Sequence, residues 1–212
     1  MQKGCKKHHW NPKMGIFIYG ERDNKYILDL VKISLCLTFA CRYLQHASFE
    51  KKTLLFVSTK KQITPIVKRA AQKCGASYLT SRWRSGTLTN WEVCRSRIAY
   101  FNTLNALKKT DKMRGFYTKK EISRLNRVLK KLKRAFSGLR NMVRTPDCVI
   151  IIDPRCERKA VSECVKLRIP VISILDVSAN PSLVDIPIPL NIDSIPAIKY
   201  MLSELSRAIA SS

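Results

Sequence analysis

The 212-residue sequence has only seven glycines and three histidines, and its acids are scarce, with 15 Asp and Glu against 40 Lys and Arg. So few glycines leave little material for a phosphate-binding loop, and neither G-x-G-x-x-G nor G-x-x-x-x-G-K-[ST] occurs. Three histidines also supply few candidates for a general base. The composition therefore disfavours a nucleotide-dependent enzyme and acid–base catalysis.

No apolar run approaches the 18 or so residues of a membrane-spanning helix, because three charges interrupt the nearest candidate, Ile27–Leu44. None of the eight cysteines forms a C-x-x-C pair and no secretory signal precedes them, so we expect reduced, packed thiols. A zinc site could be built from Cys5, His8 and His9, but no second ligand pair at metal spacing accompanies them. The N-terminus is basic but too short for a transit peptide, so we expect any import signal to be absent or already removed. We expect neither a cofactor nor a resident metal.

The net charge of +25 is concentrated in the middle of the chain. Between positions 108 and 144, fourteen basic residues stand against Asp111 and Glu121, whereas acids outnumber bases from Val171 onward. Like charges one turn apart on a helix repel, so this segment requires an anionic partner unless it is simply a solvated, solubilising face. A membrane-surface helix would need a free apolar face. RNA phosphates fit better, and we expect RNA to bind mainly outside the C-terminal quarter.

Strand and helix patterns alternate along the rest of the chain. Near-continuous apolar runs such as Thr53–Thr59 are typical of parallel strands that are covered on both faces. The alternation predicts an α/β fold with a mostly parallel sheet and helices on both faces. The expected strands cover 53–59, 77–80, 147–153 and 170–176, with a last extended piece at 185–191; the expected helices cover 26–47, 63–75 and 154–167, and a terminal helix starts at Asp193 or Ser194.

An insertion interrupts this alternation and reads as two helices. Thr89–Glu92 and Thr118–Glu121 each match the capping box, so each predicts a helix start. Both helices carry an apolar stripe, and a turn around Arg114-Gly115 would join them into an antiparallel hairpin about 30 Å long. The sheet cannot cover a hairpin of that length, so we expect it to project. The expected division is an α/β sheet domain at 1–88 and 140–212, with an inserted basic hairpin at 89–139.

Aromatic rings stand among basic residues in two stretches, Ser81–Arg97 and His8–Lys13. Core packing is one interpretation, and we expect it for Trp91, which lies on the apolar stripe of its helix. Trp83 lies in the preceding loop, where an exposed or half-exposed ring would stack on an unpaired base. The candidate RNA-binding residues are Trp10, Asn11, Lys13, Arg22, Lys60, Lys61, Arg82, Trp83, Arg84, Asn90, Arg95, Lys119, Lys120, Arg127, Lys130, Lys131 and Arg134.

Two carboxylates, Asp153 and Asp176, lie at the carboxyl ends of expected strands, at the edge where such sheets place active sites. They could hold a metal in a Rossmann-like RNA-processing enzyme. The competing interpretation is that Asp153 caps the next helix, with Pro154 at its first position. No metal partner or paired carboxylate has the spacing to act with Asp153. We therefore favour the structural interpretation and do not expect an enzyme.

Several stretches resemble the bacterial-type ribosomal protein S two family of the small subunit. They are "WNPKMGIFIYGERDNKYILDL", "LLFVSTKK", "SRWRSGTLTNWEVCRSRI" and "PDCVIIIDPRCERKAVSECVKLRIPVISILDVSANPSLVDIPIPLN", in family order over nearly the whole chain. The resemblance implies a flavodoxin-like parallel sheet with a projecting helical hairpin. It also implies a non-enzymatic role in binding small-subunit rRNA between head and body, beside neighbouring proteins that include the S one type.

The sequence departs from the family pattern at several positions. Arg84-Ser85-Gly86 stands where the family has Leu-Gly-Gly, and Cys5 stands where it has a histidine. The family stretches D-T-N and N-D-D are represented by 176–178 and 191–193 with altered residues, which changes the polar groups at those strand ends. The chain carries more positive charge than we expect of family members from free-living bacteria. This excess indicates an organellar ribosome. We prefer a plastid, with a mitochondrion or the bacterial cytoplasm as alternatives.

Overall fold

The central sheet has five parallel strands in the computed structural model, which describes residues 5–6, 10–23, 25–110 and 117–211. Their order is β5-β4-β6-β7-β8, and each neighbouring pair is parallel. Counted from the first of these strands in the chain, the order is 2-1-3-4-5, that of flavodoxin-like folds. The expected fold class is confirmed. The strands are β4 (Leu54–Val57), β5 (Ser77–Leu79), β6 (Cys148–Ile152), β7 (Val171–Leu175) and β8 (Ile186–Pro189).

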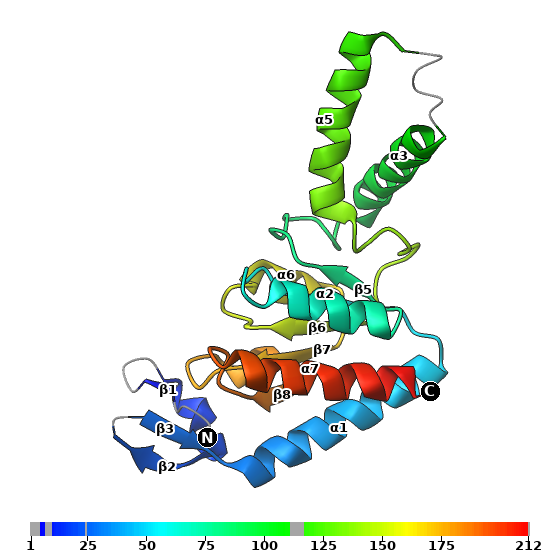
Figure 1. Cartoon of the computed structure of the whole chain (residues 1–212). Helices are drawn as coiled ribbons and strands as arrows, with labels where there is room; N and C mark the ends of the chain where they lie inside the picture. The colour runs from blue at the N-terminus through cyan, green and yellow to red at the C-terminus, as the bar shows by residue number, and fades with distance from the viewer. Residues whose placement is uncertain (1–4, 7–9, 24, 111–116, 212) are drawn as a thin grey trace.

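Strands β4, β5 and β6 send alternate side chains into two separate cores. In β4, Leu54 and Phe56 enter one core, and Leu55 and Val57 enter the other. Three helices cover the first face, and Figure 1 shows them on the same side of the sheet. The second face is covered by one helix of the sheet domain and by the root of the hairpin. The first three helices are α1 (Leu30–Phe49), α2 (Thr64–Lys73) and α7 (Ile195–Ala210), and the helix on the second face is α6 (Arg158–Lys166).

The inserted hairpin consists of α3 (Trp91–Lys109) and α5 (Lys119–Phe136), which extend away from the sheet (Figure 1). Apolar side chains on the facing sides of the two helices pack into the second core, including Phe101, Leu104 and Leu129. Trp91 is half-buried, not fully buried as expected. The expected turn at 114–115 lies outside the described residues, and the domain limits stay a prediction.

Two helices begin later than the sequence patterns predicted. The N-cap of α3 is Asn90, and no side chain caps this end, so the capping box expected at Thr89–Glu92 is wrong. Helix α6 begins at Arg158 because a turn separates it from Pro154, so the predicted start at that proline is also wrong.

Other predicted helix ends are confirmed by their local chemistry. Thr118 and Glu121 form the reciprocal capping box of α5. Pro65 lies in the first turn of α2, and Gly75 follows that helix with a positive φ of 68°, which suits glycine. Ser194 is the N-cap position of α7.

A small antiparallel sheet at the N-terminus was not expected. It has the order β1-β3-β2, with β1 (Cys5–Lys6), β2 (Ile18–Arg22) and β3 (Lys25–Leu28), and a 3-10 helix, η2 (Pro12–Phe17), precedes β2. A short 3-10 helix, η3 (Pro181–Leu183), precedes β8. The predicted helix over 26–47 therefore begins only after Asp29, whose carboxylate accepts hydrogen bonds from the first backbone N–H groups of α1. The outer side of α1 leaves Leu35 and Phe39 exposed, so the broad burial expected for this helix was overestimated.

Seven cysteines are free thiols: Cys36, Cys41, Cys74, Cys94, Cys148, Cys156 and Cys164. Cys94, Cys148 and Cys164 are buried. Burial raises the pKa of the Cys148 and Cys164 thiols to about 12, so both remain protonated and inert at neutral pH. No helix in the described ranges is long and apolar enough to span a bilayer.

Gly138 joins the hairpin to the sheet at a point without room for a side chain. Its carbonyl accepts a hydrogen bond from the Tyr78 N–H (3.1 Å), and a Cβ at this position would overlap the Tyr78 carbonyl and ring. We predict that Gly138→Ala lowers the free energy of unfolding by about 1–3 kcal/mol, because the overlap forces β5 and the hairpin root apart. Thermal unfolding followed by circular dichroism measures this loss. Gly20→Ala is the control, since a Cβ there meets nothing within 4 Å; equal losses in both variants would contradict the packing argument.

Candidate RNA-binding surface

A single buried carboxylate, Glu163 on α6, holds the loop that leads into the hairpin. Its Oε1 accepts hydrogen bonds from Trp83 Nε1 (3.0 Å) and the Gly86 N–H (2.8 Å). Its Oε2 accepts from the Leu88 N–H (2.8 Å) and from the N–H and hydroxyl of Thr89 (3.2 and 3.4 Å). Both carboxylate oxygens are therefore occupied by donors from one short stretch of chain. The loop is fastened to α6 along its length.

The electrostatics of Glu163 favour its ionised form. Burial acts to raise the pKa of this carboxyl, but the donors from Trp83 and from the backbone of 86–89 outweigh it, so the pKa lies below its usual value. Hydrogen bonds to a charged group are worth about 1.5–3 kcal/mol, more than neutral ones. The ionised carboxylate thus stabilises this loop at neutral pH.

Trp83 does not present its ring to solvent, so the exposed or half-exposed ring expected from the sequence is wrong, and the stacking interpretation loses its basis. The side chain is 5% exposed and packs in the second core. Its indole N–H must find an acceptor once buried, and Glu163 provides it. The neighbouring Arg82 and Arg84 remain exposed, so the tryptophan anchors the loop and the arginines face outward.

Five cations converge where this loop meets the hairpin. They line a hollow of about 600 Å³ and come from three segments: Arg82 and Arg84 from the loop, Lys131 and Arg134 from α5, and Lys159 from α6. All five side chains are exposed, and the lining includes no acid. Among the described residues none of the five forms an ion pair. The hollow is therefore a concentrated positive site open to solvent.

Lys159 was missed from the sequence. It lies in a different helix from the predicted hairpin bases, and only the packing of α6 beneath the loop brings it to them. Arg97 was also missed; with Arg84 and Asn90 it lines a smaller hollow on the α3 side of the loop.

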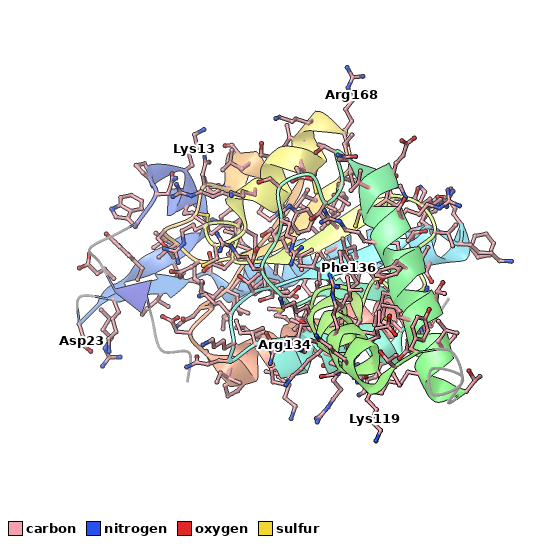
Figure 2. The ribbon with its side chains drawn as sticks, turned by 90° about the horizontal axis from the view of Figure 1, so that it is seen from above. Lys13, Asp23, Lys119, Arg134, Phe136 and Arg168 are labelled. Atoms are coloured by element: carbon pink, nitrogen blue, oxygen red, sulfur yellow. The ribbon has the colours of Figure 1, made fainter. Side chains whose placement is uncertain are left out.

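The positive surface continues along α5 above this hollow. Lys120, Arg124, Arg127 and Lys131 line a shallow groove, and its one acid, Glu121, is engaged in the capping box with Thr118. The remaining predicted bases of the hairpin, Lys119, Lys130 and Arg95, are exposed but line none of these hollows. Figure 2, which looks down on the hairpin, shows Lys119 and Arg134 on the outer side of α5.

The predicted N-terminal residues lie far from the hairpin, beside the small sheet (Figures 1 and 2). Trp10 is 42% exposed, and its ring is tilted on that of Tyr26 at 5.5 Å between centroids. The Asn11 side chain caps η2 by accepting from the Lys13 N–H, and Lys13 Nζ donates to the Ser182 hydroxyl (3.1 Å). Exposed Arg22 lies 3.8 Å from the carboxylate of the adjacent Asp23. These residues form a separate surface.

Lys60, another predicted RNA contact, is committed to an internal ion pair. Its Nζ lies 2.9 Å from Oδ2 of Asp153, which is 1% exposed, and Arg155 Nε lies 3.2 Å from the other oxygen. Lys61, next in the chain, is exposed. Beside this pair, buried Glu157 accepts the Thr59 N–H (2.7 Å). These contacts lie at the carboxyl ends of β4 and β6, where the strand order reverses and such folds bind ligands.

Asp153 does not cap α6, contrary to the structural interpretation drawn from the sequence. Its backbone has a φ of 62°, and its carboxylate faces Lys60 and Arg155. Burial acts to raise the pKa of this carboxyl, but the Lys60 hydrogen bond and charge and the Arg155 charge lower it overall. Arg155 also lies 3.9 Å from Asp176. Both candidate metal ligands therefore face cations of the chain itself.

No group of three or more His, Cys, Asp or Glu in the described ranges is placed to hold a metal. His8 and His9 lie outside those ranges.

The fold and the charged arm define a flavodoxin-like α/β protein with a basic helical hairpin. A sequence model of the family Ribosomal protein S2 matches residues 1–212. The small ribosomal subunit proteins uS2c of Emiliania huxleyi and Guillardia theta are each 44% identical, with 97% of this chain aligned to 90% and 87% of the relative. Small ribosomal subunit protein uS2 of Picosynechococcus sp. is 41% identical over 97% of this chain and 80% of its own. The chain belongs to the ribosomal protein S2 family.

The buried carboxylate yields a prediction about stability and its pH dependence. We predict that Glu163→Gln lowers the free energy of unfolding by about 2–3 kcal/mol at pH 7, because an amide NH₂ would face N–H donors of the loop. The folded pKa of Glu163 lies below the ordinary 4.5, so the stability it contributes is present above about pH 4.5 and is lost as pH falls through the folded value. Denaturant unfolding at pH 7, 5 and 3.5 should show the gap between wild type and variant narrowing with acid.

Glu92→Gln is the matched control, because it removes the same charge from an exposed position in the first turn of α3. A Glu163→Gln variant no less stable than this control would contradict the anchoring role of the carboxylate.

Proposed function

We propose that this chain is a structural constituent of the small ribosomal subunit of a plastid, and that it binds small-subunit rRNA through the hairpin and the loop before it. The observation that carries the RNA-binding part is the acid-free hollow formed by Arg82, Arg84, Lys131, Arg134 and Lys159. Family membership supports the ribosomal part. Neighbouring small-subunit proteins, with the S one type as a candidate, are the other partners.

The electrostatic argument starts from self-repulsion. Five cations around one hollow repel each other, and their mutual repulsion falls when phosphates enter. Each phosphate that a Lys or Arg neutralises releases condensed counterions from the RNA, which favours binding at low salt.

The hydrogen bonds of Glu163 support RNA binding because they restrict the conformations of the loop that carries Arg82 and Arg84. Because Trp83, Gly86 and Leu88 are held by one carboxylate, Arg82 and Arg84 are presented from a fixed backbone. A preorganised site loses less conformational freedom on binding than a mobile loop would.

The proposal includes no catalytic step. Asp153 is neutralised by Lys60 and Arg155, and Glu157 is bound to the loop after β4, so the acids near the usual ligand crevice are engaged with groups of the chain itself. The RNA-processing alternative has no observation in its favour.

The plastid location rests on the relatives. Algal uS2c proteins lie at 44% identity, and a cyanobacterial uS2 protein lies at 41%. Sedimentation of the native protein with plastid small subunits, and not with mitochondrial ones, is the direct test.

The RNA-binding hollow yields a prediction on salt dependence. We predict that combined Lys131→Gln, Arg134→Gln and Lys159→Gln weakens binding to small-subunit rRNA and reduces the slope of log K against log salt by about two, because each lost phosphate contact removes roughly 0.7–0.9 from that slope. Filter binding between 50 and 200 mM salt measures both quantities.

The control removes three lysines elsewhere, with Lys25→Gln, Lys68→Gln and Lys166→Gln, all at exposed positions. This control variant tests the effect of a general loss of positive charge. The slope of log K against log salt should change much less in it than in the hollow variant. Equal effects of the two triple variants would show that net charge, and not the hollow, governs binding.

A further inference from the structure

A second basic feature lies on the opposite face of the sheet, in a groove between α2 and α7. Figure 1 shows these helices side by side, away from the hairpin. The groove has a volume of about 270 Å³ and an aliphatic floor that includes Ile66, Ala70 and Leu202. Its lining also contains Arg69, Lys73 and Lys199 and no acid.

The groove exists because small side chains face each other where the helices pack. Ala70 on α2 and Ser203 and Ser206 on α7 are too short to fill the space between the two ridges. The Ser203 hydroxyl donates to the Tyr200 carbonyl (2.8 Å) and the Ser206 hydroxyl to the Ser203 carbonyl (3.0 Å). Because both hydroxyl protons are used within α7, the wall offers mainly carbon to an occupant.

The three cations determine the sign of the occupant. Arg69 and Lys73 lie one turn apart on α2, and Lys199 reaches the groove from α7; all three are exposed. Like charges at this spacing repel, so an anionic occupant relieves the repulsion.

The apolar floor of the groove indicates whether its occupant is a protein or RNA. Single-stranded RNA gains affinity by stacking bases on aromatic rings, and no aromatic residue lines this groove. Phosphate contacts alone require no apolar floor, whereas the apolar face of a peptide does. We propose that the groove docks an acidic amphipathic segment of a neighbouring protein. One apolar side chain lies on Ala70 and Leu202, and flanking carboxylates pair with Arg69, Lys73 and Lys199.

The test is site-specific photo-crosslinking in assembled small subunits. Benzoylphenylalanine is introduced at Lys73, which is exposed, and in a second variant at Ser203 in the groove wall. The expected result is a crosslink to a protein segment that carries at least two carboxylates within about four residues of an aliphatic or aromatic side chain. A crosslink to rRNA alone, to a basic segment, or to nothing would overturn the docking proposal.

The docking proposal rests on the proposed function in one respect, because the partner is sought in the small subunit. Sedimentation of each variant with the small subunit tests that function separately from the crosslink.

A charge reversal supplies the second measurement. Arg69→Glu combined with Lys199→Glu should reduce the crosslink yield from the Ser203 position about tenfold, since both rim contacts become repulsive. The matched control, Lys25→Glu with Lys166→Glu, should leave the yield unchanged. Equal yields from the groove variant and the control would contradict the proposed pairing.

Discussion

The structure depends on one ionised side chain placed where α6 meets the loop before α3. Glu163 joins α6 to the loop before α3 by hydrogen bonds to Trp83, Gly86, Leu88 and Thr89. An ionised carboxylate buried without partners would be strongly destabilising, and here every approach to it is filled by a donor. The same contacts seat the Trp83 ring in the second core. The hydrogen bond from Trp83 to Glu163 thereby fixes the position of the buried indole ring. The exposed arginines on either side of Trp83 are held in place with it.

This anchoring explains how a long basic hairpin is carried by a small sheet. Within the described residues, α6 is the one helix of the sheet domain on the second face. Phe136, Leu139 and Met142 at the base of the hairpin complete the cover with Trp83. The root of the hairpin is therefore part of the hydrophobic core, while its upper part is held by the α3–α5 seam. Removing the hairpin would uncover the sheet, so the charged arm and the fold stabilise each other.

Much of the fold follows from local patterns in the sequence. The apolar runs located the five strands of the main sheet, and Thr118 and Glu121 located the start of α5. The site was predicted less well because its contacts are remote in sequence: Trp83 and Glu163 are 80 positions apart, and no local pattern shows that flanking arginines can surround a buried ring. Likewise, the partner of Lys60 could be found only once β4 and β6 lay side by side.

The placement of the few acids determines which cations are available to a partner. At the carboxyl edge of the sheet, Asp153 and Asp176 form ion pairs with Lys60 and Arg155, so the positive charge there is neutralised within the protein. At the hairpin root, the buried carboxylate of Glu163 turns its oxygens to the loop and not to the surrounding cations. The same residue types therefore stabilise the fold in one place and remain free in the other. The chain has 15 acidic residues for 40 basic ones, so most of the surplus positive charge must be neutralised by an external partner. A polyanion binds most favourably at the surface that has no acidic residues.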